Sequence, residues 1–136
     1  MEKSKITRYI AAILDERSEV LFGYIHGSIS SSDNPRDIDV AVFIDPGLYE
    51  ELVARGEVNI GFAIPLEMEL EKMVDGKVDV QILNGAPLGF QYRVINGGSL
   101  VTDKDSDMRA DFECMTRVKY FDFRPRVQEY LREITT

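Results

Sequence analysis

Residues 20–44 constrain the fold of this chain more than any other segment. VLFGYIH (20–26) is a short, continuous apolar run of the kind found in buried strands, and IDVAVFI (38–44) is a second run, rich in β-branched residues. The residues between them, SSSDNPR (30–36), favour turns throughout. The segment therefore predicts two strands joined by a polar loop.

Two acidic residues, Asp37 and Asp39, open the second run. Side chains two positions apart on a strand point to the same face, so these carboxylates would lie side by side. They would repel each other unless water, protons or a cation lay between them, and a divalent cation is the usual partner. Gly27 and Ser28, which end the first run, offer close backbone approach and a hydroxyl, and both suit a phosphate. The segment thus predicts a metal and nucleotide site.

A third acid, Asp79, interrupts a further predicted strand, KVDVQIL (77–83). An acid in an otherwise apolar strand is costly if it is buried without compensation. If this strand lies beside 38–44, three carboxylates meet at one place and could hold two Mg²⁺ ions, which would activate an attacking hydroxyl and hold a leaving phosphate. In that arrangement Asp37 and Asp39 would bridge the ions, and Asp79 would bind the ion at the nucleophile.

The remaining segments complete an α/β (or α+β) pattern. SLVTD (99–103) predicts a short last strand, followed by two C-terminal helices, of which the second has Pro125 in its first turn. Apolar spacing and helix-start signals predict earlier helices at residues 4–17, 48–56, 59–74 (kinked or started by Pro65) and 87–96.

Length and composition narrow the class of protein further. The 136 residues suit a single domain (1–136), with a core at about 4–102 and a C-terminal helical segment at about 103–134. No apolar run is long enough for a membrane span or a signal peptide, and a single cysteine excludes an intrachain disulfide, so we expect a cytoplasmic protein. A net charge of −8 disfavours direct nucleic-acid binding and would suit a basic protein partner.

Taken together, Gly27-Ser28, the Asp37-Ile38-Asp39 triplet and Asp79 resemble the signature of minimal nucleotidyltransferases of the polymerase-β-like superfamily. Residues 78–134 resemble the C-terminal part of MntA-type antitoxins, which belong to HEPN/MNT toxin–antitoxin pairs. The resemblance covers residues 20 to 134 or so, and it implies a mixed sheet of three to four strands flanked by helices. The family usually has ten residues between Gly-Ser and Asp-x-Asp, whereas this chain has eight (29–36).

The resemblance also implies an activity. Proteins of that type use Mg²⁺ and transfer AMP from ATP to a tyrosine of a HEPN-domain RNase toxin, which silences the toxin. It implies that Asp37, Asp39 and Asp79 are catalytic metal ligands and that Gly27 and Ser28 contact the nucleotide phosphates. A homo-oligomer and a hetero-oligomer with the toxin are both compatible with it. Two alternatives stay open: an antitoxin that neutralises the toxin by binding alone, and a nucleotidyltransferase with a small-molecule acceptor.

Overall fold

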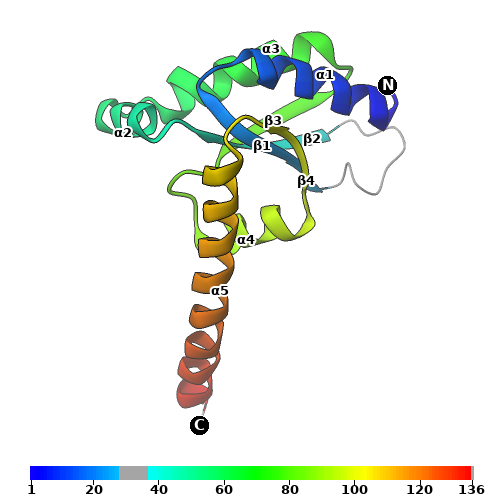
Figure 1. Ribbon diagram of the computed structural model, residues 1–136. Helices are drawn as coiled ribbons and strands as arrows, with labels where there is room; N and C mark the ends of the chain where they lie inside the picture. Colours follow the sequence, from blue (N-terminus) through cyan, green and yellow to red (C-terminus); the bar gives the residue numbers. More distant parts are fainter. Residues whose placement is uncertain (28–36, 136) are drawn as a thin grey trace.

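A four-stranded mixed sheet forms the centre of the computed structural model, which describes residues 1–27 and 37–135 (Figure 1). Ser28 and the eight-residue spacer lie outside the described residues. The strands stand in the order β3-β2-β1-β4. Their bounds are β1 Val20–His26, β2 Asp37–Ile44, β3 Lys77–Ile82 and β4 Ser99–Asp103. All four predicted strands are therefore present.

The strand pairing is what brings the acidic residues together. β1 is antiparallel to both β2 and β4, whereas β3 is parallel to β2. A parallel neighbour needs a crossover connection, and residues 45–76 supply it as a series of helices. Because the two strands run the same way, the first residues of β2 and β3 lie at the same end of the sheet.

The crossover begins with α2 (Pro46–Arg55), in which Pro46 occupies the first turn and the Asp45 carboxylate accepts a hydrogen bond from the Leu48 N–H at 3.0 Å. The single helix predicted at 59–74 is divided in two. A π-helical turn, η2 (Val58–Ala63), leads into α3 (Ile64–Met73), and Pro65 marks the start of α3. A proline has no N–H to donate and fits best in a first helical turn, which explains this boundary.

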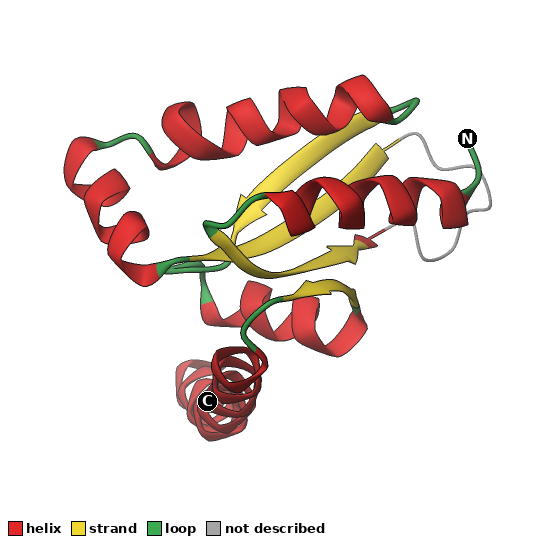
Figure 2. Ribbon diagram, turned by 45° about the horizontal axis from the view of Figure 1, so that its top comes forward, coloured by secondary structure: helices red, strands yellow, loops and turns green. Residues whose placement is uncertain are grey.

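Helices cover both faces of the sheet (Figure 2). The helices α1 (Lys3–Glu16) and α3 pack on one face, and α4 (Leu88–Gly97) and α5 (Ser106–Thr135) lie on the other. The first face buries alternate residues of β2, namely Ile38, Val40, Val42 and Ile44. The second face buries a smaller cluster that includes Phe22, Tyr24, Ala41, Leu83, Val94 and Ile95. Asp37 and Asp39 belong to this second face by the alternation of β2.

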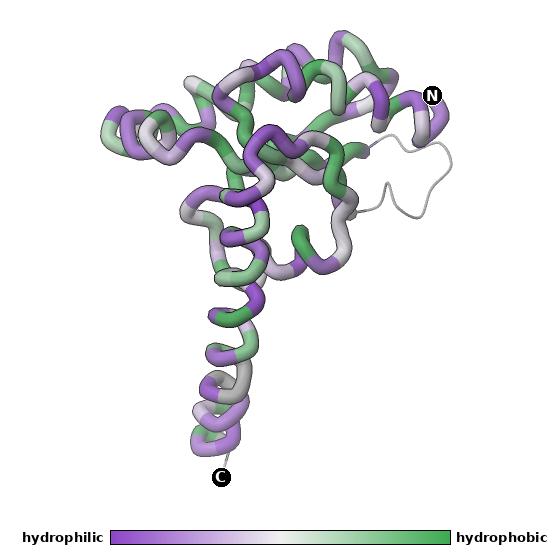
Figure 3. The backbone as a smooth tube through the Cα atoms, viewed as in Figure 1, coloured by the Kyte–Doolittle hydropathy of each residue, from purple (hydrophilic) through white to green (hydrophobic). Residues whose placement is uncertain are grey.

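The two helices predicted at the C-terminus are joined in one helix, α5, which runs through Pro125 and extends away from the body of the protein (Figure 1, Figure 3). Its first turns pack on the sheet, where Phe112 contacts the rings of Phe22 and Phe43. An internal proline removes one backbone hydrogen bond, and water can satisfy the freed carbonyl on an exposed helix, so the helix need not end there. Among the described residues, no helix combines the length and apolar character needed to cross a membrane.

Candidate active site

A row of three polar residues crosses the sheet at the start of β2. His26 of β1 is paired with Asp39 of β2, and Asp39 is paired with Asp79 of β3. Partners in adjacent strands present their side chains on the same face. Asp37 lies two residues before Asp39 and shares that face. The two acid-bearing strands are therefore neighbours, which meets the condition set from the sequence and brings all three aspartates to one end of one face.

This end of the face is open. Further along β2, Ala41 is buried and Phe43 packs under α5, whereas Asp37 and Asp79 are exposed. A cavity of about 430 Å³ at this end of the sheet has a lining drawn from both faces, namely the three aspartates, Lys77, Ile38, Val78 and the α3 residues Glu67 and Glu71. The lining is thus strongly acidic, with a single lysine among the described side chains. Such a cavity suits cations or a cation-bound polyanion far better than a free phosphate.

The glutamates of α3 fix the position of β3. The Val80 N–H donates to Glu67 Oε1 at 2.9 Å, and the Val78 N–H donates to Glu71 Oε1 at 3.0 Å. β3 is an edge strand of the described sheet, so these N–H groups would otherwise have no partner in a neighbouring strand. Because Asp79 lies between the two valines, α3 also fixes its backbone. Sequence reasoning missed both glutamates, since only the helix crossover brings them to this edge.

A hydrogen-bonded chain links the outer acid to β1. The Gln81 side chain donates from Nε2 to Asp79 Oδ2, and its Oε1 lies 2.9 Å from His26 Nε2. A carbonyl oxygen can only accept, so the His26 Nε2 carries the proton in this arrangement. The His26 ring also meets Phe90 edge to face, with centroids 5.6 Å apart. Gln81 was not predicted as a site residue, although its place two residues after Asp79 puts it on the same face.

Gly27 stands against the central acid. Its φ is +79°, and a Cβ atom at this position would lie 2.5 Å from Asp39 Oδ2. Only glycine avoids both the backbone strain and this collision. The close approach holds the end of β1 directly beside the Asp39 carboxylate. Ser28, the second residue predicted to contact phosphate, lies outside the described residues.

The donor chemistry of this end of the sheet fits Mg²⁺. Within the described part of the chain, no three His, Cys, Asp or Glu side chains are gathered closely enough to hold a metal ion by themselves. Mg²⁺ does not need such a cage, because it usually binds one or two protein carboxylates and completes its shell with waters and substrate phosphates. Asp37, Asp39 and Asp79 all line one cavity, and their carboxylates are the kind of ligand that Mg²⁺ prefers.

The fold and the sequence of this chain are those of a nucleotidyltransferase. A family model described as "Polymerase beta, Nucleotidyltransferase" matches residues 8–107, which is more than half of the chain. The chain belongs to this family. The matched region includes His26, Asp37, Asp39 and Asp79, and also the two glutamates that fix β3.

Solved structures of toxin–antitoxin complexes share the fold. A chain of the tri-AMPylated Shewanella oneidensis HEPN toxin in complex with MNT antitoxin aligns with a TM-score of 0.68 and 18% identity, covering 98% of this chain and 99% of that chain. A toxin–antitoxin structure with AMP-PNP gives 0.66 and 20%, covering 100% of both chains. The toxin–antitoxin MntA-HepT gives 0.64 and 17%, covering 99% and 100%. At these identities the likeness shows the fold. No curated protein sequence matches this chain significantly.

Proposed function

We propose that this chain is a Mg²⁺-dependent adenylyltransferase that transfers AMP from ATP to a tyrosine of a partner HEPN-domain toxin and so acts as an antitoxin. The observation that carries the proposal is the pairing of Asp39 with Asp79, with Asp37 on the same face and Gly27 beside them. Membership of the nucleotidyltransferase family supports the transfer of a nucleotide. Structures of the same fold contain an AMPylated toxin and AMP-PNP, which supports AMP as the transferred group and a HEPN protein as its acceptor.

Each acid has a part in this proposal. Asp37, Asp39 and Asp79 would hold Mg²⁺, while Gly27 and Ser28 would contact the outer phosphates of ATP. When bound, Mg²⁺ supplies charge stabilisation to the phosphates of ATP. Asp79 orients the acceptor hydroxyl and receives its proton. Gln81 donates a hydrogen bond to Asp79, and the lack of a side chain at Gly27 leaves room for the Asp39 carboxylate.

The proposed partner surface lies on the far half of α5. Phe123, Tyr130 and Ile134 are seven and four residues apart, so they share one side of the helix. Their side chains are 53%, 63% and 60% exposed. A lone helix with large apolar groups in water is the kind of surface that a partner protein covers. We call this surface the α5 face and assign it to the HEPN partner.

Mass spectrometry of the partner tests the proposal. The purified HEPN protein is incubated with this chain, ATP and Mg²⁺, and a tyrosine should gain the mass of one AMP, with loss of the partner's RNase activity. Inhibition of the RNase with no added mass would favour an antitoxin that acts by binding alone. AMP transfer to small hydroxyl compounds but never to the partner would favour a small-molecule acceptor.

A further inference from the structure

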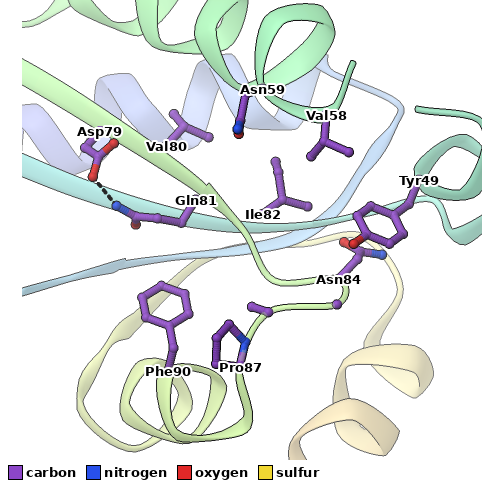
Figure 4. A pocket seen from close by; sticks show the side chains of 12 residues that line it. Tyr49, Val58, Asn59, Asp79, Val80, Gln81, Ile82, Asn84, Pro87 and Phe90 are labelled. Carbon is purple, nitrogen blue, oxygen red and sulfur yellow. Dashed lines mark hydrogen bonds between the residues drawn. The ribbon is translucent and has the colours of Figure 1, made fainter. Parts of the chain in front are cut away.

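A second cavity lies along β3 and has Asp79 at one end of its lining (Figure 4). It has a volume of about 570 Å³ and extends from Asp79 to Tyr49 of α2. Asp79 is among the residues that line both this cavity and the acidic one. Of the described residues that line the second cavity, only Asp79 carries a charge.

The walls of this cavity suit a flat, largely apolar group. Phe90 and Pro87 lie on one side, and Val58 and Asn59 of η2 lie on the opposite side (Figure 4). The Phe90 ring makes an edge-to-face contact with His26, which orients the ring, and Phe90 lines this cavity together with Asp79. Aromatic rings favour such offset and edge-on neighbours, so a second ring would find a preformed partner here.

The position of the cavity indicates what enters it. Across the sheet the order is Gly27 at the end of β1, then Asp39, then Asp79 on the outermost strand. In phosphoryl transfer, the attacking and leaving oxygens lie on opposite sides of the phosphorus. If the outer phosphates bind at Gly27, the attacking oxygen arrives from the side of Asp79, where this cavity opens. The nucleoside stays bonded to the α-phosphorus and points away from both the attacking and the leaving oxygen.

We propose that this cavity, the acceptor pocket, binds the aromatic ring of the acceptor tyrosine with its hydroxyl directed at Asp79. This inference rests on the proposed function and adds the place where the acceptor binds. The phenol oxygen forms a bond to the α-phosphorus of ATP, and the bond from that phosphorus to the bridging oxygen breaks. Pyrophosphate leaves with the electron pair, and the phenol proton passes to Asp79. Phe90 and Pro87 favour a ring over the short side chain of serine.

Asn59 allows the pocket to be blocked without disturbing the core, because its side chain is exposed at the rim. Asn59→Trp should fill the pocket and raise the KM for the HEPN acceptor at least about tenfold. The KM for ATP should stay within about twofold, since the nucleotide lies outside the pocket. Ile60→Trp is the matched control, because Ile60 is 76% exposed on the same turn η2 but is not among the residues that line the pocket, and it should leave both values within about twofold of the unchanged chain.

A small phenol gives a second readout. p-Cresol, which is the ring of tyrosine without its backbone, should inhibit AMP transfer competitively with the acceptor and not with ATP, and Asn59→Trp should abolish this inhibition. Transfer with an unchanged acceptor KM in Asn59→Trp would overturn the inference while leaving the proposed function intact. A raised KM for ATP in that variant would also overturn it, because the pocket would then hold the nucleobase. No transfer by the unchanged chain would overturn the proposed function itself.

Discussion

A Cβ atom at Gly27 would lie 2.5 Å from Oδ2 of Asp39. Gly27, which directly follows β1, therefore limits the space available to the Asp39 carboxylate of β2. The positive φ of Gly27 adds a second reason for glycine, since it lies in the left-handed region that other residues avoid. Gly27 thus leaves room for Asp39, a proposed metal ligand, and is also the residue predicted to contact the phosphates.

Replacement of Gly27 by alanine should disable the site. In Gly27→Ala, Asp39 must move to admit the methyl group, and a shift of this kind should lower AMP transfer roughly 100-fold. Gly56→Ala is the matched control, because Gly56 has a φ of +68° but nothing within 4 Å of its Cβ position. Both variants should lose about 1–2 kcal/mol of stability to backbone strain, as measured by urea unfolding. Equal activity in the two variants would show that a side chain at position 27 does not disturb Asp39.

The hydrogen bond from Gln81 to Asp79 should increase the rate of AMP transfer. Gln81→Leu keeps the size of the side chain but removes both the donor to Asp79 and the acceptor for His26. We expect AMP transfer to fall roughly 10- to 100-fold, as for other residues that orient a metal-binding carboxylate. The readout is kcat at saturating ATP and acceptor, with the melting temperature as the measure of folding. A variant with wild-type kcat would show that Asp79 needs no support from Gln81.

Tyr24 should contribute to stability through α5. Its side chain is 2% exposed, and its hydroxyl donates to Glu113 Oε1 at 2.7 Å. Burial and this bond raise the pKa of the Tyr24 hydroxyl far above its ordinary value, so it remains a donor at alkaline pH. Tyr24→Phe should cost about 1 kcal/mol in urea unfolding. Tyr92→Phe is the control, because no hydrogen bond of the Tyr92 hydroxyl is found among the described residues. Equal losses in the two variants would count against an anchoring role for the Glu113 bond.

The α5 face gives a prediction about partner binding. Tyr130→Asp places a charge on this face and should weaken binding of the HEPN protein at least about tenfold, because a buried charge without a partner is costly. The measurement is isothermal titration calorimetry. Gln128→Asp puts the same charge on another side of the same helix turn and should bind normally. If both variants bind as the unchanged chain does, the partner docks elsewhere.

Much of the sheet could be predicted from the sequence, because alternation along a strand is a local property. The period of two put Asp37 and Asp39 on one face and marked Asp79 as the same kind of exception on a later strand. The sequence left open whether these strands are neighbours, and the pairing of Asp39 with Asp79 shows that they are. The mixed sheet and its four strands are confirmed as well.

The supporting contacts could not be predicted in the same way. Glu67 and Glu71 read as ordinary charges of an amphipathic helix, and their hydrogen bonds to β3 depend on how the crossover packs. Pro125 suggested a helix boundary, but whether a helix ends at a proline depends on what satisfies the freed carbonyl. The role of Gly27 against Asp39 likewise depends on the register between β1 and β2.

Asp39→Asn tests most directly whether the carboxylates of Asp37, Asp39 and Asp79 carry out nucleotide transfer. The variant and the unchanged chain are incubated with α-labelled ATP, Mg²⁺ and the HEPN protein, and the label on the partner is measured. Asp45→Asn is the matched control, since asparagine also caps α2 and the same charge is lost just beyond β2. We predict that Asp39→Asn lowers labelling by at least about 100-fold with an unchanged melting temperature, while Asp45→Asn labels normally. Undiminished labelling by Asp39→Asn would contradict the account.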